Sequence, residues 1–447
     1  MNEWTNAETR AERARELYDQ GRLAEAAAEL RAAITVNPYN PAWHFNLGLV
    51  LDAMDDHASA CHAYRDALRL NPNDVETLNC LGVSMNRAGR YSQALKYFRR
   101  IERVDATYEP CYCNRIISYA ELYQHDQAEV MFYTARLFKD ECPLCFFNLA
   151  GSFYNCGEYD RAIDCWQQTL RLDDKHPQAN ARIADCFWAK GDLTSALRHY
   201  EAELELSPDD VDTMLDYGEL LMTIDRLEEA EDQFRFVLER EHDNATANFC
   251  LGEIAFKRGQ IDAAEKRFKR TLRIDRSFAG AHARLGQIML KRRQLANAAR
   301  HFLTEMRLCG DDPQMLQQLG ELLLEAKQAR HAGTAFRRLL TLSPKDAAAQ
   351  HNLAVACFLT GRIDEGIRHC KKAIKLRPDY PLALYNLALA HYRKGEMPQA
   401  RRYAAKALAL APRQDEIRAL SRKVGAYGFW RWLKRLAHHL TKRDRGE

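Results

Sequence analysis

The chain has 447 residues, 47% of them hydrophobic, and its 65 Lys and Arg nearly balance 62 Asp and Glu, so the formal net charge is +3. The apolar residues suffice for a core, and the small net charge argues against nucleic acid as a partner. No apolar run approaches the length of a membrane span, and the polar start does not resemble a secretion signal. We therefore expect a cytoplasmic protein whose 13 cysteines are mostly reduced.

A 34-residue unit recurs twelve times without insertion or deletion between residues 7 and 414. Each unit carries two runs of apolar residues at helical spacing, separated by a turn that often contains Gly, and half of the units end with Pro at position 32. Neither helix can bury its apolar face alone, so stacking of the units must form the core. The units begin at residues 7, 41, 75, 109, 143, 177, 211, 245, 279, 313, 347 and 381.

Three positions of the unit are restricted in size. Position 20 is Ala in every unit except the eleventh, which has Gly366, and position 8 is Gly or Ala in every unit except the fourth, which has Ile116. Small residues at these positions let the two helices of a unit approach each other closely. Position 24 is a bulky residue in most units, such as Phe302, and we expect it to fill the gap toward the next unit.

This register resembles the tetratricopeptide repeat family over residues 7–414. The resemblance implies an all-α fold, an α-solenoid of helix–turn–helix units that forms a right-handed superhelix. It also implies that the first helices build a concave groove in which extended peptides lie. After the array, residues 415–424 are expected to form a helix that caps the last unit, followed by a basic amphipathic tail at 428–447.

Positions 2, 5, 6, 9, 12 and 13 of the first helices are expected to face the groove. Asn side chains there could hold a peptide backbone, because an amide both donates and accepts, and aromatic rings could anchor side chains. The alternative is that both kinds of residue only pack between units. The predicted peptide-binding residues are Phe45, Asn46, Asn114, Phe147, Asn148, Tyr154, Trp188, Phe249, Phe256, Asn352, Phe358, Tyr385, Asn386 and Tyr392.

Charge is arranged in blocks along the array. Acidic residues dominate residues 211–244, and basic residues dominate residues 257–300. A partner of complementary charge could be guided by this step, or the charges could pair with one another on a solvated surface. The predicted charged groove residues are Arg182, Asp216, Glu219, Glu253, Lys257, Arg284 and Lys291.

Cysteines are concentrated in the fourth to sixth units. Cys111, Cys113, Cys142 and Cys145 form a C-x-C and a C-x-x-C that could supply four thiolates to a metal ion. However, Cys111 and Cys145 occupy the same position of neighbouring units, about 10 Å apart, which is too far for one ion. We therefore expect no metal and no cofactor, with a metal- or redox-responsive scaffold as an alternative.

The tail combines basic and aromatic residues. Such a helix suits the surface of an anionic membrane or a groove on a partner protein, or it could fold back onto the last unit. The residues predicted for this role are Phe429, Trp430, Arg431, Trp432, Lys434 and Arg435.

No catalytic motif is present. We predict a non-enzymatic scaffold that binds an extended peptide or partner protein in its groove. The alternative is an assembly or regulatory factor that the tail localises to the inner membrane surface.

Overall fold

The structure, a computed structural model, describes residues 3–425. Within these residues the backbone forms helices and turns and no β-strand, so the prediction of an all-α repeat solenoid is confirmed. The first helices of the units are α1 (Glu3–Asp19), α3 (Pro41–Ala53), α5 (Val75–Arg87), α7 (Pro110–Glu121), α9 (Pro143–Asn155), α11 (Ala179–Ala189), α13 (Val211–Thr223), α15 (Ala245–Lys257), α17 (Ala281–Lys291), α19 (Pro313–Glu325), α21 (Ala347–Leu359) and α23 (Pro381–Arg393).

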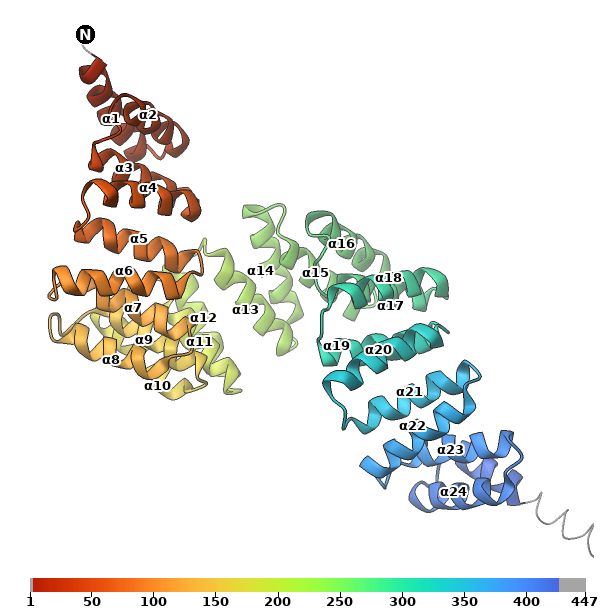
Figure 1. Ribbon diagram of the computed structural model, residues 1–447. Helices are drawn as coiled ribbons and strands as arrows, with labels where there is room; N and C mark the ends of the chain where they lie inside the picture. The colour runs from red at the N-terminus through yellow and green to blue at the C-terminus, as the bar shows by residue number, and fades with distance from the viewer. Residues whose placement is uncertain (1–2, 426–447) are drawn as a thin grey trace, which may run out of the picture. The chain divides into compact units, whose positions relative to one another are not determined.

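A second helix follows each first helix after a short turn (Figure 1). These helices are α2 (Leu23–Val36), α4 (His57–Leu70), α6 (Tyr91–Val104), α8 (His125–Arg136), α10 (Tyr159–Leu172), α12 (Leu193–Leu206), α14 (Leu227–Arg240), α16 (Ile261–Ile274), α18 (Leu295–Leu308), α20 (Ala329–Leu342), α22 (Ile363–Leu376) and α24 (Met397–Leu410).

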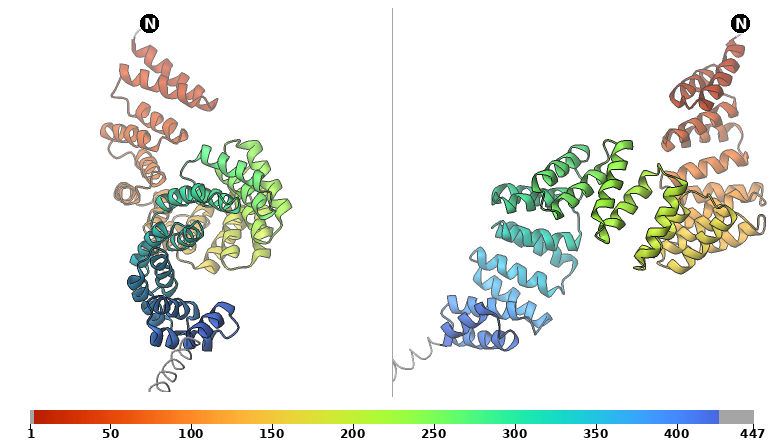
Figure 2. Two further views of the ribbon diagram at one scale, coloured as in Figure 1. Left: turned by 90° about the vertical axis from the view of Figure 1, so that its right-hand side faces the viewer. Right: turned by 180° about the vertical axis from the view of Figure 1, so that it is seen from behind.

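The chain divides into two compact units, residues 1–233 and residues 234–447, each a stack of helix pairs. Figure 2 shows this stacking from two further sides, from α1 to α12 in one compact unit and from α15 to α24 in the other. In each stack a helix packs against its partner in the repeat and against the next repeat, as α9 does with α10 and α7. One hydrophobic cluster therefore extends from Ala7 to Cys186 in the first compact unit, whereas the second compact unit holds several smaller clusters.

The turn between the two helices is the same in every repeat. Its residue at position 15 has a positive φ in all twelve, from Gly21 (φ 73) to Gly395 (φ 76). Glycine takes up this left-handed conformation without steric cost, which explains its frequency at this position. Tyr123 adopts it in the fourth repeat (φ 56) with its side chain 77% exposed.

The aromatic ring at position 24 lies over the glycine at position 8 of its own repeat. A Cβ placed on Gly286 would come within 2.3 Å of Cε1 of Phe302, and one on Gly48 within 2.4 Å of Cε1 of Tyr64. Both rings are fully buried. In the repeats that have glycine at position 8, the ring occupies the space that a side chain there would need.

In two repeats, a buried glutamate of the second helix accepts hydrogen bonds from the start of the first helix. Glu203 accepts hydrogen bonds from the backbone N–H groups of Gln178 (2.8 Å), Asn180 (3.0 Å) and Ala181 (3.3 Å) at the start of α11. Glu305 accepts from Gly280 (2.7 Å) at the start of α17 in the same way. These carboxylates satisfy N–H groups that a helix start leaves without partners.

The chain is helical from residue 415 to residue 425, where the described residues end. Ile417 packs with Leu384 and Ala407, and Leu420 and Val424 pack with other residues of the last repeat. These contacts cover the apolar surface that the last repeat would otherwise expose. The predicted tail at 428–447 lies outside the described residues.

Candidate binding groove

A cavity of about 340 Å³ lies among the first helices of three successive repeats, α7, α9 and α11. Four residues predicted for the groove line it, namely Phe147, Asn148 and Tyr154 from α9 and Arg182 from α11. The remaining lining residues are Ile117, Ala120, Glu121, Gly151, Asn155 and Trp166.

All of these lining residues except Trp166 occupy positions 5, 6, 9, 12 or 13 of their repeats. The sequence positions expected to face the groove therefore do line this cavity. Gly151, at position 9, has no heavy atom within 4 Å of the site of a Cβ, so its missing side chain leaves space. The sequence pattern did contain this signal, since Gly151 is a glycine within a helix.

Aromatic rings form one wall of the cavity. The ring of Trp166 lies 6.2 Å from that of Phe147 and 6.1 Å from that of Tyr154, centroid to centroid. Tyr154 is 36% exposed, whereas Trp166 is buried and its indole N–H has no acceptor among the described residues. Such a wall offers apolar contact area to a ligand.

Arg182 is the only basic residue predicted for the groove among the described residues of this compact unit, and carboxylates surround it. Arg182 donates to Asp185 at 3.1 Å. The pKa of Asp216 is raised to about 6 by burial and by the nearby carboxylates of Asp185 and Glu219, against the effect of Arg182. Because these carboxylates surround Arg182, Glu121 in the cavity wall can favour a positively charged side chain on a ligand.

The predicted Asn residues connect neighbouring repeats. In four of them the side-chain N–H donates to a group of the preceding repeat, so this part of the amide already has a partner within the array. The four hydrogen-bonded pairs are Asn114 with Asn79 Oδ1 (3.0 Å), Asn148 with the carbonyl of Cys113 (3.4 Å), Asn352 with Glu321 (3.1 Å) and Asn386 with His351 Nε2 (2.9 Å). The fifth, Asn46, is exposed and lines a cavity near the N-terminus.

Most other predicted rings pack within the array. Phe45 contacts Tyr64, and Phe249 contacts both Phe268 and Phe278. Trp188 is partly buried. The remaining rings are Phe358, which lies over Gly366, and Tyr385 and Tyr392, which pack on the cluster of the last repeat and its cap.

The predicted charged residues of α15 and α17 pair with one another. Arg284 donates to Glu253 at 2.6 Å and lies over the ring of Phe256, and Lys291 Nζ lies 4.0 Å from the centroid of the same ring. Lys257 is exposed on the same helix as Glu253. Pairing within the surface therefore accounts for part of the basic block.

A pair of half-buried histidines lies in the same compact unit. Nδ1 of His282 lies 3.0 Å from Nδ1 of His301. Burial lowers the pKa of His301 to about 4, helped by His282, Arg300 and Lys269 and opposed by Glu265. Burial also lowers the pKa of His282.

We expect the stability of the protein to fall as the pH drops from about 6.5 toward 4. In this range the unfolded chain binds more protons than the folded chain, because an unfolded histidine titrates near 6.5. Replacing His301 with Gln should reduce the loss of stability between pH 7.5 and pH 5 by about 1 kcal/mol. Urea unfolding at the two pH values measures this difference. Replacing the exposed His242 with Gln is the control, and an equal effect there would contradict the assignment to the half-buried pair.

The cysteine prediction needs a correction. The group that the structure brings together is Glu109, Cys113, Cys142 and Cys145, whose ligand atoms all lie within 4.8 Å of one another. Cys111 is not in this group, although it is buried on the same helix as Cys113. Glu109 takes the place that the sequence had suggested for Cys111.

Residues Phe429, Trp430, Arg431, Trp432, Lys434 and Arg435 lie outside the described residues, so a role for them at a membrane or partner stays a prediction. Among residues 3–425, none of the helices combines the length and apolar character that crossing a membrane requires.

Known proteins share the repeat pattern. Sequence models of the tetratricopeptide repeat match residues 14–55, 41–74, 63–96, 147–211, 187–248, 251–313 and 346–413.

Among curated proteins, "Protein CTR9 homolog" of Arabidopsis thaliana is 26% identical over 216 residues, 45% of this chain and 20% of that protein. "Peroxisome biogenesis protein 5" of the same plant is 29% identical over 168 residues, 37% of this chain and 22% of that protein. The chain thus spans about a fifth of the length of these relatives.

Two solved structures are similar over most of the chain. The match to a chain of the APC/C hetero-tetramer Cut9-Hcn1 covers 92% of this chain and 95% of that chain, at 14% identity and a TM-score of 0.39. Yeast Tom70 covers 99% of both chains, at 14% identity and a TM-score of 0.39. With its repeat models spread over more than half of its length, the chain belongs to the tetratricopeptide repeat family.

Proposed function

We propose that the chain is a non-enzymatic scaffold that holds an extended segment of a partner protein against α7, α9 and α11. The observation that carries this proposal is the cavity in which Phe147, Asn148, Tyr154 and Arg182 meet. The curated relatives support a role in protein interaction, since one is named as the "Peroxisomal targeting signal receptor" of Saccharomyces cerevisiae. A cytoplasmic location is part of the proposal.

The chemistry of the cavity defines the segment that would fit. An aromatic or aliphatic side chain would pack against Phe147, Tyr154 and Trp166. A Lys or Arg beside it would meet the carboxylate of Glu121. The partner segment is therefore apolar and basic, and its binding weakens as salt is added.

Replacing Tyr154 with Ala is expected to weaken binding of the partner segment by about tenfold or more, because the ring is a partly exposed anchor in the cavity wall. Proteins captured by the full chain are identified by mass spectrometry and tiled as peptides, and the affinity of each bound peptide is measured at low and high salt.

Replacing Tyr133 with Ala is the matched control, since Tyr133 is a 57% exposed tyrosine on α8 and lies outside the cavity. Peptides that bind the Tyr154 variant as tightly as the unchanged chain would place the binding surface elsewhere and defeat the proposal.

A further inference from the structure

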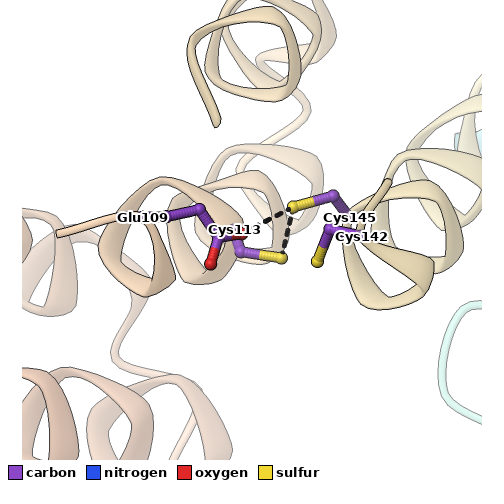
Figure 3. Close-up of side chains that lie close together, drawn as sticks. All are labelled: Glu109, Cys113, Cys142 and Cys145. Atoms are coloured by element: carbon purple, nitrogen blue, oxygen red, sulfur yellow. Dashed lines mark hydrogen bonds between the residues drawn. The ribbon is translucent and has the colours of Figure 1, made fainter. Parts of the chain in front are cut away.

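Three thiols and one carboxylate converge between α7 and α9 (Figure 3). Glu109 and Cys113 extend from the start of α7, and Cys142 and Cys145 extend toward them from the start of α9. Sγ of Cys145 lies 2.7 Å from Sγ of Cys113 and 3.4 Å from Oε1 of Glu109. Each pair of side chains comes from one helical turn, which places both of its members on the same face.

The donor set fits zinc. Zinc in proteins takes four ligands in a tetrahedron, preferably thiolates, and accepts a carboxylate oxygen. With Zn–S distances of about 2.3 Å, two bound sulfurs are separated by about 3.8 Å. The four ligand atoms already lie within 4.8 Å of one another, and a rotation of the Cys113 or Cys145 side chain would give the required separation.

The three thiols of the cluster are buried and the Glu109 carboxylate is partly buried, so a bound ion would be largely shielded from solvent. Thiols bind zinc in their ionised form, and the positive charge of the ion would stabilise the thiolates in this buried setting.

An ion has both a path and outer contacts. A cavity of about 310 Å³ is lined by Glu109, Cys113 and Cys142 together with Lys139, whose side chain is exposed to solvent. Nδ2 of Asn148 lies 3.9 Å from Sγ of Cys113, within reach of an N–H···S hydrogen bond. Such outer hydrogen bonds orient metal ligands.

We propose that Glu109, Cys113, Cys142 and Cys145 bind a zinc ion that ties the first helices of the fourth and fifth repeats together. Binding releases the protons of the thiols that are still protonated, so it weakens as the pH falls. A disulfide between Cys113 and Cys145 would use only two of the four converging groups, whereas zinc uses all of them. This site is separate from the peptide cavity in its ligands, and its test does not depend on a partner protein.

The test measures zinc in the full-length chain after purification with a reductant and without a chelator, followed by titration of the metal-free protein with zinc against a competing chelator. The expected result is one zinc ion per chain. Cobalt added to the metal-free protein should give a sulfur-to-cobalt charge-transfer band. Cys145→Ser and Cys142→Ser should each lower the zinc affinity by more than about tenfold.

Cys111→Ser is the matched control, because Cys111 is a buried thiol on the same helix as Cys113 but lies outside the cluster. It should keep the zinc, and circular dichroism of each variant shows whether the helices remain. Two results would overturn the proposal, namely a chain that takes up no zinc, or equal loss of zinc in the Cys111 variant.

Discussion

Replacing Glu203 with Ala is expected to lower the free energy of unfolding by about 3 kcal/mol. The carboxylate is fully buried and accepts three backbone N–H groups at the start of α11. Its removal leaves these donors without acceptors and removes a negative charge from the positive end of the helix. Urea unfolding of the full chain measures the loss, and amide exchange at Asn180 and Ala181 should accelerate most.

A second substitution separates the contribution of the charge of Glu203 to stability from that of its side-chain shape. Glu203→Gln keeps one acceptor oxygen and nearly the same volume, so it should lose about half as much stability as the Ala variant. The exposed Glu205 on the same helix is the control, and its replacement with Ala should change little. Should the variants at 203 and 205 unfold at the same urea concentration, the buried carboxylate would not stabilise α11 as argued.

Glu305 provides an independent repetition of the experiment. It accepts from Gly280 and from Ala283 (3.0 Å) at the start of α17, in the other compact unit. The two glutamates share no partner, so the effects of Glu203→Ala and Glu305→Ala on unfolding should add.

The repeat register could be predicted from the sequence because position-specific packing limits residue size. Ala26, Ala60 and the alanines that follow them at position 20 are fully buried, so a larger residue there would separate the two helices. The carboxylate caps were missed. Glu203 and Glu305 stand at position 27, where Ala33 and Ala67 are buried, and a charged residue at a buried position was the available signal.

The sequence predicted which positions of the repeat face the groove, but not which of the twelve repeats leave a cavity there. The same columns of the unit exist twelve times, and side-chain packing decides which copies leave a cavity. Phe45 and Phe249 fill their surroundings with neighbouring rings, whereas Gly151 leaves space beside Phe147 and Tyr154. The spacing of the columns does not distinguish these copies, whereas the glycine at residue 151 within a helix was a signal that could have done so.

The cysteine cluster shows a similar limit. Helix spacing sets the distance between equivalent backbone positions, but Cys113 and Cys145 are not equivalent positions, and their side chains extend toward each other across the interface. The backbone spacing of Cys111 and Cys145 therefore carries no information about the approach of Cys113 and Cys145.

Gly286→Ala is expected to destabilise the chain by about 1–2 kcal/mol, although alanine is the better helix former by about 1 kcal/mol. The new methyl group would come within 2.3 Å of the ring of Phe302, which is fully buried and must move. Urea unfolding of the full chain measures the loss. Gly333→Ala is the matched control, since its Cβ would meet Ala356 at an ordinary 3.7 Å in the same compact unit.

The reason for this loss can be tested by shrinking the ring as well. The first repeat pairs Ala14 with Leu30, a combination that the repeat evidently accommodates. In a Gly286→Ala chain that also carries Phe302→Leu, the methyl group has space, so the double variant should lose less stability than the sum of the two single variants, by about 1 kcal/mol. Additive losses would mean that Gly286 is required for a reason other than the ring of Phe302. A positive coupling would show that glycine at position 8 and an aromatic ring at position 24 are one packing unit, repeated wherever both residues occur.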